Sequence, residues 1–336
     1  MQNKWPMVSV VVINFKGTQQ LEKCLNHLTK TVYPNYEIII VDCLTENLET
    51  WIRKHFPTAK VIHYDRDIGP SASHNVDKNF LNPQSKYLAF LDNDAYVTEN
   101  WLTELVKVME YDSQIGIAQA KILMTSNSRL MDNAGIAIDA LGTWYTTRGA
   151  KAYRFQNLFE IFAASSAGCL VLRKAFEEAG GFDPDYFIYD DDTDFSFRVR
   201  LLGYRIVFVP SAIVFHDAEP VRALSPRKLF HSVKNRLYTM LKNYELKNLW
   251  WRVSVYSFLT SLAGVSFIVL KRSAEAKQIF KGILYPLLKI GEIWKKRVAI
   301  QSSRRVRDSE LLKCSLIRED VRATLLDIKL KASIFL

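Results

Sequence analysis

Apolar residues over the first 92 positions form short, β-branched runs, separated by stretches in which apolar residues recur at helical spacing. Runs of the first kind are typical of strands buried on both faces, and the second pattern is typical of helices. Strands are predicted at residues 8–15, 36–42, 60–64 and 86–91, and helices at residues 21–28, 48–56 and 71–81. This alternation predicts an open, mostly parallel α/β sheet with helices on both faces.

Polar residues follow the ends of these strands. Asn14, Asp42, the loop that contains Asp67 and the pair Asp92 and Asp94 all fall at carboxyl ends, where open α/β sheets bind their ligands. Asp92 and Asp94 would bring two hard oxygen donors to one point, which suits Mg²⁺ or Mn²⁺ bound between the protein and a diphosphate. A solvated turn that caps the next helix is the alternative interpretation of this pair.

A second acidic cluster, four carboxylates in five positions, occupies residues 190–194 and leads into a helical pattern that closes at Gly203. Acids at a helix N-terminus are favoured by the helix dipole, so simple capping is one interpretation. The carboxylates are more numerous than capping needs, however. Crowded like charges raise the pKa of at least one of them, which favours proton transfer or metal binding. A strand at residues 205–209 then leads toward His216, which is either a structural histidine or a metal ligand.

The 336 residues exceed the usual length of a single domain, and their charge is unevenly divided. Acids outnumber Lys and Arg by about six through residue 220, whereas Lys and Arg outnumber acids by about 16 afterwards. We therefore predict a folded α/β domain at residues 1–220 and a basic, helical region at residues 221–336 that meets an anionic partner. The four cysteines lack zinc or disulfide spacing, which favours reduced thiols and a cytosolic location.

The basic region begins with a cationic, aromatic stretch over residues 227–252 and continues into an uncharged stretch over residues 253–270. The uncharged stretch is near the lower length limit of a spanning helix, but serine and threonine gather on one of its sides. Trp250 and Trp251 suit the headgroup region of a bilayer, and a second apolar stretch at residues 283–290 has basic flanks. An interfacial helix on an anionic membrane is therefore predicted, with a spanning helix and a buried structural helix as alternatives.

Several short motifs occur in order between residues 8 and 216. They are residues 8–15, 40–42, 68–69 with Asn75, 91–94, 167–168, 181–183, 191–194, 203–204 and 214–216. The ordered set resembles glycosyltransferase family 2, the inverting transferases of GT-A fold, and particularly its rhamnosyltransferase-like, membrane-associated branch. The resemblance implies an enzyme that moves a sugar from a nucleotide-diphosphate sugar to a hydroxyl of a lipid-linked or polysaccharide acceptor. Such an enzyme would be peripheral on the cytoplasmic face of the cell membrane, or carry one membrane-embedded helix.

The resemblance also implies roles for individual residues. Asp42 would contact the nucleobase, and Asp92 the ribose or the metal region. Asp94 and His216 would hold a divalent metal, Mn²⁺ or Mg²⁺, on the donor diphosphate. The general base would be Asp192, although Asp191 stands where the family usually has Glu and leaves the base open between these two residues. The remaining predicted donor contacts are Asn14, Asp67 and Asn75.

Three other interpretations are less well supported. A sugar nucleotidyltransferase would carry a Gly-rich phosphate loop after its first strand, and residues 14–17 are a poor substitute. A non-catalytic scaffold of the same fold would be expected to lose one of Asp94, Asp192 or His216, and all three are present. A nucleic-acid partner is not predicted, because the sequence contains no recognisable nucleic-acid module and its N-terminal part is acidic.

Overall fold

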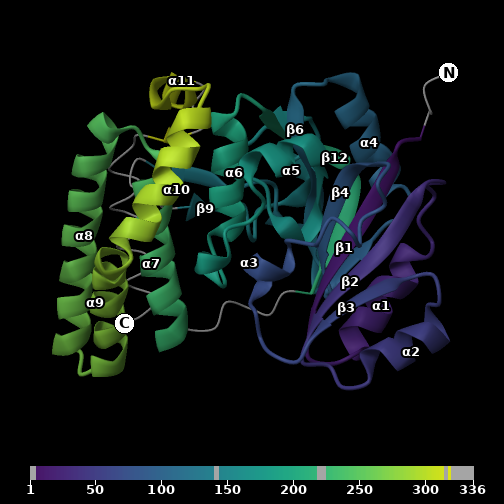
Figure 1. The fold of residues 1–336 in the computed structure, drawn as a ribbon, viewed down its shortest axis with the longest axis horizontal. Helices are drawn as coiled ribbons and strands as arrows, with labels where there is room; N and C mark the ends of the chain where they lie inside the picture. Colours follow the sequence, from purple (N-terminus) through teal and green to yellow (C-terminus); the bar gives the residue numbers. More distant parts are fainter. Residues whose placement is uncertain (1–4, 140–143, 218–224, 314–316, 319–336) are drawn as a thin grey trace.

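A computed structural model describes residues 5–139, 144–217, 225–313 and 317–318. Within these residues the centre is a mixed ten-stranded sheet (Figure 1). Along its main path the strands are β10 (Phe159–Glu160), β12 (Arg205–His216), β6 (Ile115–Met124), β11 (Cys169–Leu172), β4 (Ser85–Asp92), β1 (Met7–Phe15), β2 (Tyr36–Cys43) and β3 (Lys60–Tyr64). Off this path, β5 (Ala95–Val97) pairs with β12 and β7 (Asn127–Asn133) pairs with β6. The predicted fold class is confirmed.

The four N-terminal strands β3, β2, β1 and β4 run parallel in that order. Asn14 is paired with Asp42 on the neighbouring strand, and Ile13 is paired with Asp92 on the other side. The strand ends therefore meet on one edge of the sheet, as the sequence predicts. The interiors of β1, β2 and β4 are almost wholly apolar and buried, as expected of parallel strands covered on both faces. The edge strand β3 is only partly buried.

Helices form a layer on each face of the sheet. Side chains of β1 alternate between the two layers, with Val10 and Val12 in one apolar cluster and Val11 in the other. The first cluster includes residues of α1 (Gln19–Leu28), α2 (Leu48–His55) and α4 (Trp101–Tyr111), and the second includes residues of α5 (Arg173–Ala179) and α6 (Asp191–Leu201).

Two elements differ from the sequence prediction. The helix expected over residues 71–81 is only α3 (Pro70–Ser73), after which the chain turns. The side chain of Asn75 bonds both the amide and the carbonyl of Phe182, a long-range contact that draws the chain away from a helical path. The strand expected at residues 205–209 continues to His216, because a register shift between Val209 and Ile213 accommodates the proline between them.

The middle segment, residues 115–170, is less regular in the sequence, yet its described residues contain six strands or strand pieces, β6 to β11, besides short turns. A small second sheet joins β8 (Ala137–Asp139) to β9 (Trp144–Tyr145) and to β13 (Ile317–Arg318). Short 3₁₀ turns η1 (Ala152–Arg154), η2 (Ser166–Gly168) and, further on, η3 (Pro184–Tyr186) complete the loops. Short pieces of this kind depend on neighbours distant in sequence, so local patterns do not reveal them.

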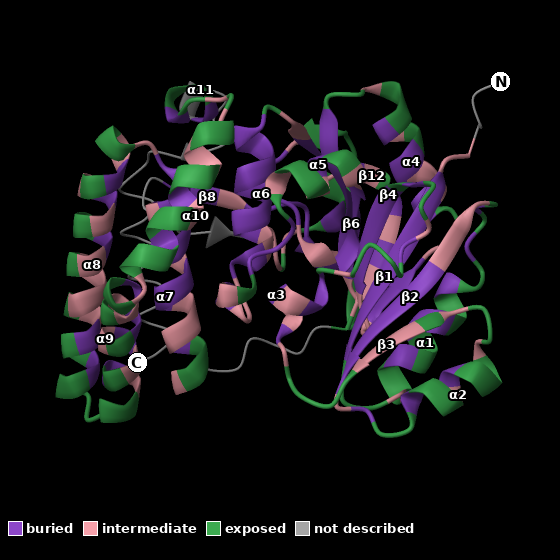
Figure 2. Ribbon diagram, viewed as in Figure 1, coloured by how far each residue is buried: buried purple, intermediate pink, exposed green. Residues whose placement is uncertain are grey.

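The C-terminal part is helical, as predicted, with α7 (Pro226–Asn243), α8 (Leu246–Val269), α9 (Ser273–Leu288), α10 (Ile290–Ser303) and α11 (Asp308–Lys313). Side chains of α6 and of α7 to α9 share one apolar cluster, so the predicted boundary near residue 220 does not separate two independent cores. Figures 1 and 2 show α8 at the edge of the molecule with much of its surface exposed. Among the described residues, α8 alone is long and apolar enough to cross a membrane.

Three of the four cysteines, Cys24, Cys43 and Cys169, are buried and free. Burial raises the pKa of the Cys24 and Cys169 thiols well above their ordinary value, so these thiols are protonated and unreactive at neutral pH. The remaining cysteine, Cys314, lies outside the described residues.

Candidate functional site

A cavity of about 810 Å³ lies at the carboxyl ends of the central strands. It is lined by β1, β4, β12, the start of α6 and the start of α7, so segments far apart in the sequence meet there. Of the residues predicted for the site, the cavity is lined by Asn14, Asp67, Asp92, Asp94, Asp191, Asp192 and His216. Asp42 and Asn75 do not line it.

Asp92, Asp94 and His216 form a compact group in this cavity, with one ligand atom from each lying within 4.8 Å of the others. His216 Nε2 is 3.2 Å from an Asp94 carboxylate oxygen and 3.8 Å from one of Asp92. Pairing of β12 with β5 produces this approach, because it sets His216 opposite Ala95, the residue after Asp94. Two carboxylates and an imidazole are suitable ligands for Mn²⁺ or Mg²⁺, so the donor set fits a divalent cation.

The protonation of this group reflects its crowding. Burial, followed by the charge of Asp94, raises the pKa of Asp92 to about 6. Burial opposes protonation of His216, but hydrogen bonds to Asp132 and Asp94 outweigh it and raise the pKa of the imidazole to about 10. The proton on His216 therefore supplies the positive charge that the carboxylates require. A bound divalent cation would take over this role.

Asp132 is a member of the site that the sequence analysis missed. Its carboxylate is 2.8 Å from His216 Nδ1 and 2.7 Å from a guanidinium nitrogen of Arg148. Through the first contact it fixes the ring of His216 with Nε2 directed at the acidic pair, which is how outer residues orient a metal-binding histidine. Asp132 lies in the irregular middle segment, where no spacing or motif marks it.

The acids at the start of α6 have distinct environments. Asp191 is 6% exposed and lies 3.7 Å from the buried ring of His74, whereas Asp192 is less buried and accepts a hydrogen bond from the Thr193 amide. Burial, followed by the charge of Asp190, raises the pKa of Asp192 to about 7. Burial and the charge of Asp192 raise that of Asp191 well above its usual range. Both carboxyls line the cavity, and Asp192 is the more accessible of the two.

Asp194, the fourth acid of the cluster, has a different role. Its carboxylate is buried and bonded to Lys242, Arg198 and Asn243. Although burial raises its pKa, Lys242 and Arg198 hold the pKa below the ordinary value. Asp194 is therefore an ionised structural anchor that does not line the cavity. Asp190, Asp191 and Asp192 thus line the cavity, whereas Asp194 binds side chains of the helices behind it.

Asp42 lies just behind the cavity wall. Its buried carboxylate accepts hydrogen bonds from Asn14 Nδ2 and from the hydroxyl of Thr45, and it is 2.7 Å from His63 Nδ1. Asn14 itself reaches the cavity and accepts a hydrogen bond from Asn93. The carboxylate of Asp42 thus supports the cavity wall, and its predicted contact with the nucleobase stays a prediction.

Asp67 and Asn75 differ in where they lie. Asp67 lines the cavity and accepts a hydrogen bond from the Gly69 amide. In the described part of the chain, the side chain of Asn75 forms hydrogen bonds with the backbone of Phe182 alone. Contact of Asn75 with the donor nucleotide stays a prediction, and the position of the residue outside the cavity lining does not support it.

Residues from the start of α7 form another part of the cavity wall. Arg227 and Lys228 bring positive charge to it, and the guanidinium of Arg227 lies over the ring of Phe187. His231 also lines the cavity, but burial lowers the pKa of its imidazole to about 4, so it is neutral at neutral pH. Membrane contact of this basic stretch stays a prediction. Helix packing brings its first turns to the site, where positive charge would favour an anionic ligand.

The open, mostly parallel sheet with helices on both faces is the fold of the GT-A class. Solved structures support the fold. GalNAc-T7 bound to UDP, GalNAc and Mn²⁺ has a TM-score of 0.60 and 18% identity, over 86% of this chain and 58% of that one. A mannosyltransferase from Pyrobaculum calidifontis bound to GDP-Man and Mn²⁺ has a TM-score of 0.54 and 14% identity, over 90% of this chain and 86% of the other.

The family model "Glycosyltransferase like family 2" matches residues 6–239, so the chain belongs to glycosyltransferase family 2. The glycosyltransferase AglE of Haloferax volcanii is 24% identical over 66% of this chain and 70% of its own length. An N-acetylglucosaminyl-diphospho-decaprenol L-rhamnosyltransferase of Mycobacterium tuberculosis is 32% identical over 32% of this chain and 35% of its own. The family match extends past residue 220 into α7, in agreement with the position of α7 at the site.

Proposed function

We propose that this glycosyltransferase is metal-dependent and inverting, and that it transfers a hexose or deoxyhexose from a nucleotide-diphosphate sugar. The observation that carries the proposal is the juxtaposition, in one cavity, of a metal-ligand group and a carboxylate whose pKa is raised to about 7. The proposed acceptor is a hydroxyl of a lipid-linked or polysaccharide substrate. The name of the mycobacterial relative, which specifies a diphospho-decaprenol, supports the lipid-linked case.

In the proposed mechanism Asp92, Asp94 and His216 hold Mn²⁺ or Mg²⁺, which when bound would neutralise charge on the leaving diphosphate. Asp192 accepts the proton of the acceptor hydroxyl while the oxygen of that hydroxyl bonds to the anomeric carbon of the donor sugar. The bond from that carbon to the diphosphate breaks in the same displacement. Attack from the opposite face inverts the configuration of that carbon. Asp191, which is buried beside His74, keeps its proton and limits the negative charge around Asp192.

The donor nucleotide is proposed to lie along the edge formed by Asn14 and Asp67, both of which line the cavity. Asp42 would act mainly by orienting Asn14 and His63, which its carboxylate contacts at 2.5 and 2.7 Å. Arg227 and Lys228 supply positive charge for the diphosphate on the other wall.

Calorimetric titration of UDP, GDP and dTDP into the purified chain, with and without Mn²⁺, tests the proposed donor site. We expect one of the three to bind at least tenfold more tightly with Mn²⁺, because the cation joins the carboxylates to the diphosphate. Mg²⁺ in place of Mn²⁺ serves as a second titration. Absence of binding by all three nucleotides under both conditions would contradict the proposed donor class and favour a non-catalytic member of the fold.

The rate of transfer is expected to depend on pH through Asp192. A general base works only when deprotonated, and burial raises the pKa of this carboxyl to about 7. The value of kcat should therefore fall about tenfold per pH unit as the pH drops below about 7. Measurement of kcat between about pH 5 and pH 9, with saturating donor and metal, checks this. A flat profile down to pH 5 would show that Asp192 is not the titrating base.

We further propose that α8 lies in the interface of the cytoplasmic membrane leaflet. One side of α8 packs on the molecule through residues such as Leu249, Tyr256 and Phe267. Its other side presents an apolar stripe at helical spacing, Val255, Phe258, Leu262, Val265 and Val269, whose exposed fractions range from 39% to 75%. A helix that is held along its length by its own protein, with an apolar outer stripe, suits interfacial rather than spanning placement. Basic residues of the following helices complement anionic lipid.

Replacement of Phe258 and Leu262 with glutamate is expected to lower binding to anionic vesicles by more than tenfold, because two apolar insertions of about 1.5–3 kcal/mol each are lost. Co-sedimentation with phosphatidylserine-containing vesicles measures the change. The matched control replaces Tyr111 and Leu158, exposed apolar residues outside α8, with glutamate. Equal vesicle binding by the two double variants would place the membrane contact elsewhere.

A further inference from the structure

The loop before the proposed catalytic acids has an unusual backbone. Phe187, Tyr189 and Asp190 have φ angles of 64°, 68° and 60°, in the left-handed region that residues other than glycine seldom occupy. These residues lie immediately before Asp191, where α6 begins. Backbone conformations of this kind persist only where surrounding contacts hold them, and they cluster at functional sites. The contacts that hold this loop therefore influence where Asp192 lies.

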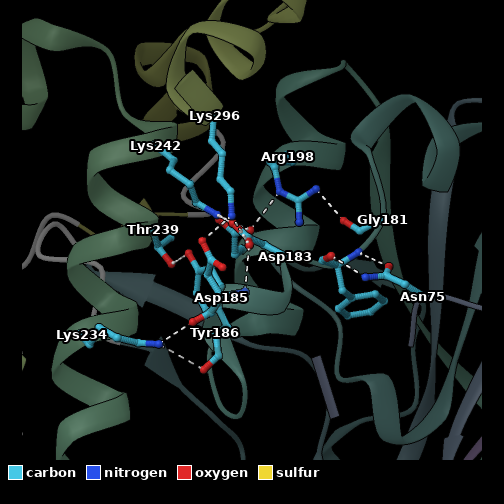
Figure 3. A network of polar contacts seen from close by, with 12 residues as sticks. Asn75, Gly181, Asp183, Asp185, Tyr186, Arg198, Lys234, Thr239, Lys242 and Lys296 are labelled. Carbon is cyan, nitrogen blue, oxygen red and sulfur yellow. Dashed lines mark hydrogen bonds and ion pairs between the residues drawn. The ribbon is translucent and has the colours of Figure 1, made fainter. Parts of the chain in front are cut away.

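Helix α7 supplies contacts to the backbone of the loop. Asn235 is fully buried, and its Nδ2 lies 3.1, 2.8 and 2.7 Å from the carbonyl oxygens of Tyr186, Ile188 and Tyr189. The ammonium of Lys234, one residue earlier, donates to the carbonyl oxygen of Asp185 (Figure 3). One helix thus binds four consecutive or near-consecutive carbonyls of a segment that has little regular structure of its own.

Ion pairs hold the segment on both sides of the loop. The buried ammonium of Lys242 lies 2.6 Å from Asp183 before the loop and 3.1 Å from Asp194 after it. Lys296 of α10 reaches Asp183 and Asp185, each at 2.6 Å (Figure 3). Burial favours the neutral form of Asp183, but the two ammonium groups outweigh it and hold the pKa of this carboxyl well below its ordinary value. The pairs are therefore ionised at neutral pH.

We propose that α7 and α10 position the catalytic base, with Asn235, Lys242 and Lys296 as positioning residues that set the loop and the first turn of α6. The inference rests on the proposed function, in which Asp192 is that base. It assigns the C-terminal helices a part in the transfer step itself, in addition to the proposed contact with a membrane. A displacement of about 1 Å in a reacting group lowers rates by about 10²-fold. Loss of one contact between these helices and the loop should therefore produce a measurable decrease in kcat.

The test compares Asn235→Ala with Asn35→Ala in the chain of 336 residues. Asn35 is a matched control, because its side-chain amide also donates to a backbone carbonyl, that of Trp5, and it does not line the cavity. We expect Asn235→Ala to lower kcat by about 10²-fold while metal-dependent binding of the nucleoside diphosphate changes less than about threefold. Hydrogen exchange of amides in residues 187–194 should accelerate at least tenfold in this variant. Asn35→Ala should leave kcat and that exchange within about threefold of the parent.

Three outcomes would overturn the proposal: an unchanged kcat, unchanged exchange in residues 187–194, or equal losses of kcat and nucleotide binding. If Asn235→Ala does not fold, Lys296→Met decides, because this side chain is 35% exposed and its loss is easier to tolerate. That variant should lower kcat by about tenfold, and an unchanged kcat would reject the inference. If the parent protein transfers no sugar, the proposed function fails, while the exchange measurement still decides whether α7 holds the loop.

Discussion

Replacement of Asp192 with asparagine is expected to lower kcat for sugar transfer by about 10³-fold, with nearly unchanged affinity for the donor nucleotide. Asparagine retains the size of the side chain and an oxygen that can accept the hydrogen bond from the Thr193 amide. It cannot take up the proton of the acceptor hydroxyl. Steady-state kinetics with the donor selected by the nucleotide titrations, together with calorimetry of the variant, measure the two quantities.

The neighbouring variant Asp191→Asn is the matched comparison, because it makes the same chemical change one residue away. Asp191 is buried and its pKa is raised well above the usual range, so it is protonated at neutral pH. We expect a loss of about tenfold or less from Asp191→Asn, since only the arrangement around Asp192 changes. A larger loss of kcat in Asp191→Asn than in Asp192→Asn would assign the base to Asp191.

Replacement of Asp94 with alanine is expected to abolish the effect of Mn²⁺ on nucleotide binding, a loss of more than about 100-fold in metal affinity. Outer-shell substitutions alone cost 10- to 100-fold, and the carboxylate of Asp94 is a proposed direct ligand. It lies 3.2 Å from His216 Nε2, within the group that could hold the cation. Titrations of the nucleoside diphosphate with and without Mn²⁺ provide the measurement.

Asp77→Ala is the control for this variant, because Asp77 is an exposed carboxylate in the turn after α3 and does not line the cavity. It should bind metal and nucleotide as the parent does. Chelation of the metal from the parent protein should reproduce the behaviour of Asp94→Ala. If nucleotide binding by Asp94→Ala keeps its full response to Mn²⁺, the cation binds elsewhere. The proposal that Asp92, Asp94 and His216 are its ligands would then be wrong.

The position of α7 changes how the C-terminal region should be tested. Removal of residues 221–336 would seem the direct test of membrane attachment, but it would also remove Asn235 and Lys242 from the acidic loop. The shared apolar cluster of α6 to α9 would be exposed as well. Substitutions on the outer stripe of α8 separate the two effects, since Phe258 and Leu262 are exposed, whereas Asn235 and Lys242 are buried.

Local patterns were sufficient to predict the central strands and the acidic pair at their edge. Apolar, β-branched runs report burial on both faces, and a change to polar residues marks the strand end. The predicted helix over residues 71–81 was mostly wrong, because the amide of Asn75 is bound to Phe182, 107 residues away in sequence. No local pattern contains such a contact.

The acidic cluster likewise combines features that local sequence predicts with features that it does not, within five residues. Its place before a helix and its excess of carboxylates could be predicted from local sequence. Which acids face the cavity could not, because Asp194 is directed by Lys242 and Asn243, 48 and 49 residues further along the chain. Asp132 was missed for a similar reason, since its contact with His216 spans 84 residues.

The sequence by itself determined the alternation of strands and helices, the edge of the sheet that carries polar groups, and the family to which the chain belongs. These features follow from periodicity and from short motifs, which are local properties of a chain. Only the tertiary structure decided that His216 faces Asp94, that Asp192 is more accessible than Asp191, and that α7 holds the acidic loop. Packing brings those groups together across long sequence separations, and their pKa values and access to the cavity depend on neighbours that packing alone supplies.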